Sequence, residues 1–111
     1  EIPQKPVPFI GATLMDVTPE IATQLGIDKD TKGSFIREVL FNSPAYKGDL
    51  RQYDVITKMD GSAYKTKEDL IAAIQKKAVG DQVKFEVLRG EKKLEITVEI
   101  GNKNDFNTQQ Q

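Results

Sequence analysis

The sequence predicts an α+β fold: a partly open antiparallel β-barrel of about five to six strands, capped by one long helix and one or two short helices. Three observations predict it. Apolar and polar residues alternate in segments 83–87 and 94–100, which is the period of a strand with one buried face. Segment 66–78 instead has apolar residues at helical spacing. A chain of 111 residues with 38% hydrophobic residues suits one domain with one core.

The strands are predicted in five segments. Residues 10–16 and 34–40 are rich in apolar side chains. A third strand is expected over 54–59, and Asp60-Gly61 directly after it is a strong turn signal. The two alternating segments close the domain as a hairpin through residues 89–92.

Hydroxyl residues mark the predicted helix starts. A Ser or Thr side chain caps a helix by accepting from its first free N–H groups, and proline suits the first helical position. The predicted helices are Pro19–Leu25 capped by Thr18, a very short helix after Ser43 and Pro44, and a main helix from Thr66 to near Ala78. Gly26, Gly48 and Gly80 follow these helices as stop signals.

The two ends of the chain differ in composition from the middle. Residues 1–8 contain three prolines and predict a linker. Residues 102–111 are mostly polar and predict a flexible tail. The domain is therefore expected to span 9–101, and the linker-like start suggests that it comes from a longer protein.

The composition excludes several classes of function. With 16 basic and 17 acidic residues, the chain has no basic excess for nucleic acid or a membrane surface. It contains no histidine and no cysteine, which excludes Ser-His and Cys-His nucleophilic pairs and the usual metal sites. A Ser-Lys pair is not excluded by spacing, but every lysine lies in a surface-like segment. We therefore predict no catalytic residue, no metal, no cofactor and no membrane-spanning segment.

The apolar segment Phe9–Met15 contains one glycine. Gly11 permits a backbone turn that directs N–H groups outward, which makes a small anion-binding concavity. If the strand that follows lies at a sheet edge, it offers unpaired N–H and C=O groups to an incoming peptide. Two interpretations stay open: capture of another protein's terminal carboxylate, or simply the first strand of a β-rich domain.

Several motifs follow one another along the chain: Phe9–Ala12, Ser43–Ala45, Asp54–Ile56, Met59–Gly61 and Asp69-Leu70. Over roughly residues 8–100, this order resembles a PDZ domain of the kind carried by trypsin-like serine proteases of the HtrA/Deg family. Two positions depart from the family pattern. Tyr53 stands where the family usually has glycine, and Met59-Asp60-Gly61 replaces the commoner Ile-Asn-Gly.

The resemblance implies a peptide-binding groove between the first strand and the main helix. The N–H groups of Ile10, Gly11 and Ala12 would hold a terminal carboxylate, and Ala12–Met15 would pair with the peptide backbone. The strand side of the implied site is Phe9, Ile10, Gly11, Ala12, Thr13, Leu14 and Met15. The helix side is Lys67, Ile71 and Ile74, and Lys5 is a candidate basic contact to the carboxylate.

Alternation places Ile10, Ala12 and Leu14 on one face, toward the pocket for the last peptide side chain. Ile71 is assigned to the groove, whereas Ile74 fits the groove and the core equally well. The small Ala12 predicts a roomy pocket that tolerates large or aromatic terminal residues. Affinity is expected to be micromolar or weaker, because ordering the peptide offsets much of the burial free energy.

The resemblance implies that the domain recruits C-terminal or extended segments with an apolar last residue for a serine protease on the same chain. It also implies a cell-envelope or secreted setting. The parent is a candidate homo-oligomer, but the sequence does not give its oligomeric state. Three alternatives remain: a regulatory or assembly domain without a free-peptide ligand, a groove occluded by the tail of a neighbour, and the PDZ domain of a tail-specific or intramembrane protease.

Overall fold

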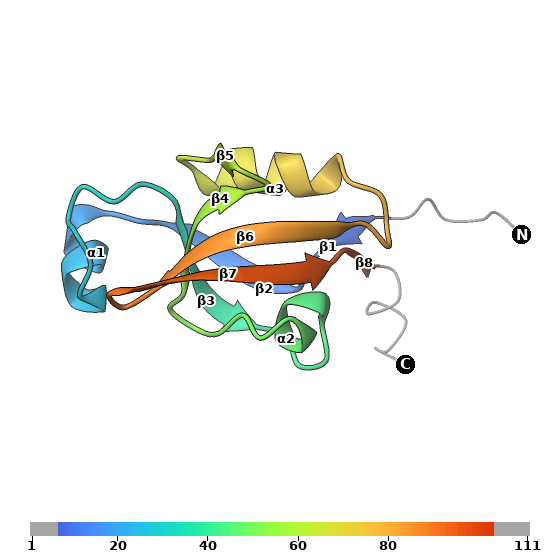
Figure 1. Cartoon of the computed structure of the whole chain (residues 1–111), viewed down its shortest axis with the longest axis horizontal. Helices are drawn as coiled ribbons and strands as arrows, with labels where there is room; N and C mark the ends of the chain where they lie inside the picture. Colours follow the sequence, from blue (N-terminus) through green and yellow to red (C-terminus); the bar gives the residue numbers. More distant parts are fainter. Residues whose placement is uncertain (1–6, 104–111) are drawn as a thin grey trace, which may run out of the picture.

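The computed structural model describes residues 7–103 and has an antiparallel sheet flanked by helices (Figure 1). The elements are β1 (Pro8–Phe9), β2 (Ala12–Asp16), α1 (Pro19–Leu25), β3 (Ser34–Val39), α2 (Pro44–Lys47), β4 (Val55–Met59), β5 (Ser62–Ala63), α3 (Lys67–Gln75), β6 (Gln82–Arg89), β7 (Lys92–Glu99) and β8 (Gly101–Asn102). The predicted fold class is confirmed, with each predicted strand and helix present.

The main sheet has the strand order β2-β3-β4-β6-β7, and β5 pairs with β4 outside this order. Its strand pairs are antiparallel. This order places β2 at one edge of the sheet. In Figure 1, α3 lies over one side of the sheet and α2 lies on the other, while α1 lies at the end opposite to β1 and β8. The strand order also leaves β7 at the other edge of the sheet, and β2 is the edge strand that the resemblance assigns to the peptide.

The three predicted caps are Thr18, Ser43 and Thr66, whose hydroxyl oxygens accept from the N–H three residues on at 3.2 Å. The main helix α3 ends at Gln75, earlier than the expected end near Ala78. Its last turn is tightened because the N–H of Lys77 donates to the Ile74 carbonyl, only three residues back, at 3.0 Å. The helix therefore ends before the stop signal at Gly80.

The core fills the space between the sheet and α3. Its largest fully buried members are Phe85, Ile36, Ile56, Met59 and Leu70, which come from β3, β4, α3 and β6. Along β6, Val83, Phe85 and Val87 are buried, as the predicted alternation requires. Because α3 is anchored by Leu70 and Ile74, its position beside β2 is set by the core.

A buried ion pair joins the end of β6 to the loop before β4. Asp54 is 1% exposed and accepts from Arg89 Nε at 2.9 Å and from Arg89 Nη2 at 2.7 Å. This carboxylate raises the pKa of the Arg89 guanidinium. The N–H of Arg51 also donates to Asp54, at 3.0 Å. Arg89 is also the last residue of β6 and pairs with Lys92 of β7. Only Gly90 and Glu91 therefore form the turn of the predicted hairpin.

The ends of the described chain are paired with each other. In the small β1–β8 sheet, Pro8 lies opposite Asn102 and Phe9 opposite Gly101. Strand pairing therefore extends one residue beyond the predicted limits of 9 and 101 at each end. Other residues of the predicted linker 1–8 and tail 102–111 lie mostly outside the described part of the chain.

Candidate functional site

A groove of about 440 Å³ lies between the β1–β2 segment and α3. This volume falls in the range of small-ligand and peptide side-chain sites. The groove is lined by Val7, Pro8, Phe9, Ile10, Gly11, Ala12, Thr13, Leu14, Leu40, Ile71, Ile74, Gln75 and Lys103. Most of these side chains are apolar, so the groove suits an apolar group.

The floor and the rim of the groove differ in burial. Ile10, Leu14 and Ile74 are buried members of the core and form the floor. Ile71 is 38% exposed and Leu40 is 48% exposed, at the rim. Ile74 thus belongs both to the core and to the groove, while Ile71 contacts the groove and solvent.

The turn at Gly11 depends on the absence of a side chain. Gly11 has φ +80°, and a Cβ at this position would lie 2.2 Å from Cβ of Ser43. A left-handed backbone next to so close a neighbour leaves no room for any residue except glycine. The turn before β2 therefore packs directly against Ser43, the cap of α2.

Two backbone carbonyls of this turn are held by neighbouring elements. The Ile10 carbonyl accepts from the N–H of Ala45 at 2.7 Å, and the Gly11 carbonyl accepts from the N–H of Leu40 at 2.8 Å. In a trans peptide the N–H points opposite to the carbonyl of the preceding residue, and no peptide bond described here is cis. The N–H groups of Gly11 and Ala12 therefore point away from α2 and β3, toward the groove side.

The strand beside this turn has one paired edge. β2 pairs with β3 from Ala12–Val39 to Asp16–Ser34, with an irregularity after Thr13. Its other edge is the sheet edge and lies beside α3. An edge strand with free backbone groups is the structure to which an extended peptide adds by main-chain hydrogen bonds.

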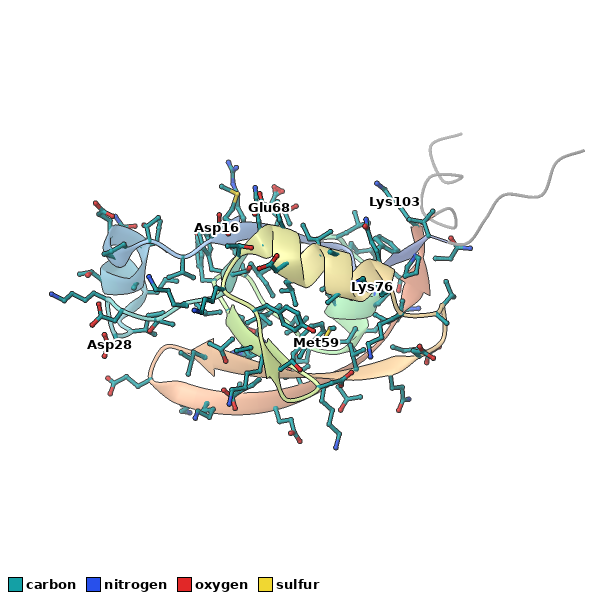
Figure 2. The ribbon with its side chains drawn as sticks, turned by 90° about the horizontal axis from the view of Figure 1, so that it is seen from above. Asp16, Asp28, Met59, Glu68, Lys76 and Lys103 are labelled. Carbon is teal, nitrogen blue, oxygen red and sulfur yellow. The ribbon has the colours of Figure 1, made fainter. Side chains whose placement is uncertain are left out.

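A hydrogen bond joins β2 to the start of α3 beyond one end of the groove. Asp16 Oδ1 accepts from the N–H of Lys67 at 2.7 Å. Figure 2 shows Asp16 beside the start of α3 and Lys103 at the opposite end of the β1–β2 segment. The lining of the groove extends from Lys103 to Leu14 and Ile71, and the Asp16–Lys67 contact lies beyond that end.

The structure gathers most of the implied site residues at this groove. Phe9 through Leu14 line it on the strand side, and Ile71 and Ile74 line it on the helix side. Met15 and Lys67 are not among its lining residues; Lys67 instead joins the helix to Asp16. Lys5 lies outside the described residues.

Five lining residues were not identified from the sequence: Val7, Pro8, Leu40, Gln75 and Lys103. Gln75 follows Ile71 by four residues, so helical spacing could have found it. Leu40 reaches the groove because its N–H binds the Gly11 carbonyl, and Lys103 because β8 pairs with β1. No local pattern signals these two contacts.

Within residues 7–103, no cluster of three or more acidic side chains is arranged to hold a metal ion. In the same range, no helix is long and apolar enough to cross a membrane. The residues that line the groove offer backbone hydrogen bonding, apolar contact and one lysine.

Comparison with known proteins supplies the family. Residues 8–100 match the family model of the PDZ domain. A probable periplasmic serine endoprotease DegP-like from Rickettsia prowazekii is 30% identical over 96 residues, covering 86% of this chain and 18% of that protein. A protein of the same name from Chlamydia trachomatis is 34% identical over 92 residues, with 83% and 18% covered. The chain spans about a fifth of the length of the curated relatives that it matches.

Solved structures agree with this match. An HtrA-type protease AlgW with a decapeptide superposes with a TM-score of 0.79 at 27% identity, covering 87% of this chain and 30% of that one. The HtrA3 PDZ domain bound to a phage-derived ligand (FGRWV) has a TM-score of 0.72 at 25% identity, with 84% of both chains covered. The chain therefore belongs to the PDZ domain family, as a binding module rather than an enzyme, and is similar to the PDZ domains of HtrA-type serine proteases.

Proposed function

We propose that this domain captures the C-terminal segment of other proteins by adding it as a strand to the free edge of β2. The peptide lies between β2 and α3, and its terminal carboxylate accepts hydrogen bonds from the N–H groups of Ile10, Gly11 and Ala12. Extended internal segments with a sharp turn bind the same edge more weakly, because they lack the carboxylate.

The observation that carries this proposal is the orientation of the turn before β2. The carbonyls of Ile10 and Gly11 are held by Ala45 and Leu40, which leaves the following N–H groups directed toward the groove side. N–H groups directed to one point bind an anion, and the adjoining edge of β2 and apolar floor suit an extended peptide. Two similar structures hold bound peptides, a decapeptide in the AlgW protease and FGRWV in the HtrA3 domain.

The groove supports an apolar last residue in the ligand. Its floor is formed by Ile10, Leu14 and Ile74, and a buried apolar side chain contributes about 1.5–3 kcal/mol. Ala12 lines the same space with a single methyl group, which leaves room for large or aromatic terminal residues. The FGRWV ligand of the HtrA3 domain also ends in an apolar residue. The cost of ordering the peptide keeps the affinity on the order of micromolar or weaker.

The role of this capture is proposed from the relatives. They are serine endoproteases by name, and a PDZ domain on the same chain as a protease delivers bound segments to it. We propose that this domain recruits substrates for such a protease. A homo-oligomeric parent would present several grooves at once, which strengthens binding of one substrate through multivalency.

The test is selection from a random C-terminal peptide library, followed by titration of each selected peptide as the free acid and as the C-terminal amide. Backbone amide NMR shifts at Ile10, Gly11 and Ala12 report on the carboxylate. We expect peptides with large apolar ends to bind, to shift these amides and to lose affinity on amidation. Absence of binding, or equal affinity of acid and amide, overturns carboxylate capture and favours a regulatory or assembly domain.

A further inference from the structure

The groove contains one charged residue among its lining residues, and this residue is a cation. Of the side chains around the groove, the other twelve are apolar or neutral, and Lys103 alone carries a charge. We propose that the Lys103 ammonium group faces the terminal carboxylate of the bound peptide and selects for it by charge. This inference rests on the proposed function and adds a specificity-determining residue to it.

The position of Lys103 is set by the pairing of the two chain ends. The N–H of Lys103 donates to the Val7 carbonyl at 2.8 Å, and Asn102 Oδ1 accepts from the N–H of Val7 at 3.2 Å. These bonds continue the β1–β8 pairing past Asn102. Lys103 is thereby held across from Val7, at the end of the groove where Gly11 makes its turn.

A glycine allows β8 to come this close. A Cβ on Gly101 would lie 2.6 Å from Cγ of Pro44 and 3.6 Å from the ring of Phe9. The strand therefore passes directly beside α2 and β1, the two elements that frame the turn at Gly11. Figure 2 shows Lys103 at this end, opposite to Asp16.

The charge of Lys103 is available to a ligand. Within residues 7–103 the ion pairs are formed by Arg51, Lys77 and Arg89 with aspartates, and Lys103 takes part in none of them. Its exposed side chain borders a groove with an apolar floor. An anion held by backbone N–H groups at such a site gains from a nearby cation, and the gain falls with rising salt.

The test is a thermodynamic cycle on the full chain that combines one substitution, at Lys103, with amidation of the peptide. The probes are the free-acid peptides selected from the C-terminal library on the wild-type chain, each with its amide. We expect Lys103→Gln to weaken binding of the acid by about two- to fivefold at low salt, as for an exposed charge pair, and to leave the amide unchanged. Lys103→Arg should restore most of the affinity. The difference should shrink as salt is raised.

A matched control is Lys76→Gln, which makes the same charge change at the C-cap of α3, at a residue that lines a different hollow with Tyr64. This variant should bind acid and amide like the wild type. If Lys103→Gln weakens both peptides equally, or leaves the preference for the acid intact, Lys103 does not interact with the carboxylate. That result overturns the inference and leaves carboxylate capture by the backbone N–H groups in place. If the wild type binds acid and amide equally, the role of Lys103 and the proposed carboxylate capture are both overturned.

Discussion

The N–H of Lys67, at the start of α3, donates to the carboxylate of Asp16, at the end of β2, at 2.7 Å. This bond joins residues that are 51 positions apart in the sequence. It satisfies one of the free N–H groups of the first helical turn and sets the separation of β2 and α3 at one end of the groove. The two walls that contact a peptide are therefore held at a defined spacing before any ligand binds.

Removing the Asp16 side chain should loosen this end of the groove. Asp16→Ala leaves an N–H at the start of α3 to water, so we expect a loss of about 0.5–1 kcal/mol in the free energy of unfolding, as for other helix caps. Peptide affinity should fall as well, and Asp16→Asn should retain part of both. Urea unfolding and peptide titration measure the effects. Glu99→Ala, at an exposed position of β7, is the control, and equal losses in the two alanine variants would contradict a role for this contact.

Substitution of Gly11 should damage the turn before β2. Gly11→Ala introduces a left-handed alanine at φ +80° and a Cβ that meets Ser43. The backbone strain alone costs about 1–2 kcal/mol, and the clash adds to it, so peptide binding should be lost. Gly90→Ala is the control, because Gly90 also has a positive φ, +63°, but nothing lies within 4 Å of its Cβ position. If both variants lose the same free energy of unfolding, the close packing against Ser43 does not contribute to stability.

Glycine at position 53 should stabilise the domain. Tyr53 has φ +73° and is 54% exposed, so its side chain is held in a strained backbone with little burial in return. Tyr53→Gly should raise the free energy of unfolding by about 1 kcal/mol, since a left-handed side chain costs about 1–2 kcal/mol and glycine loses more entropy on folding. Tyr53→Ala keeps the Cβ and should give no gain. A stabilising alanine variant would mean that the strain is not the cause.

The buried ion pair should respond unequally to loss of its two partners. Asp54 is 1% exposed, whereas the Arg89 side chain is 28% exposed. Arg89→Met leaves a buried carboxylate without its cation, and we expect a loss of about 3–5 kcal/mol. Asp54→Asn should cost less, because the guanidinium can still reach water. Urea unfolding compares them, with Arg51→Met as a control, since its ion pair to Asp49 is largely exposed. A larger loss for Asp54→Asn would reverse this explanation.

Acid should weaken the turn between β4 and β5. The pKa of Asp60 is lowered from its ordinary value of 3.8, chiefly by the hydrogen bond that its carboxylate accepts from the N–H of Lys84 and then by Lys77. Because the pKa is lower in the folded state, the ionised carboxylate stabilises the fold fully above the unfolded-state pKa. This stabilisation is lost as the pH falls through the folded-state pKa. Asp60→Asn should therefore reduce stability at about pH 7 and match the wild type near about pH 2.

Urea unfolding across this pH range measures the Asp60 effect. The change should be small, because the Asp60 side chain is 37% exposed and solvent screens its interaction with Lys77. Glu99→Gln serves as the control for the loss of one exposed carboxylate. The free energies of unfolding of Asp60→Asn and the wild type should converge below the ordinary pKa range of aspartate. A difference that persists unchanged there would show that the ionised carboxylate is not what stabilises the turn.

Much of the fold was predictable because its signals are local. Thr18, Ser43 and Thr66 cap the helices that they were expected to cap. Asp60 and Gly61, with φ of +52° and +85°, form the predicted turn between β4 and β5. A cap or a turn depends on residues within three or four positions, so the sequence carries all the information that it needs.

The candidate site was predictable in part. Phe9 through Leu14 and Ile71 were assigned to a groove on the strength of the glycine turn, the strand period and the family resemblance, and they line the groove. The resemblance places Lys67 on the helix side of the groove, but Lys67 is not among the lining residues, and its N–H donates to Asp16. Spacing along a helix predicts which side chains share a face, not how far the neighbouring strand runs beside them.

The sequence by itself therefore determined the three helices, the five longer strands, the glycine turn and the absence of His- or Cys-based chemistry, but not the two-residue strands β1, β5 and β8. Only the tertiary structure decided that β2 lies at an edge of the sheet, that Ile74 belongs to both core and groove, and that Lys103 borders the same groove as Ile10. These features depend on contacts across most of the chain, such as that of Val7 with Asn102, 95 positions away. Such contacts form only when the core has closed and its packing has brought the chain ends together.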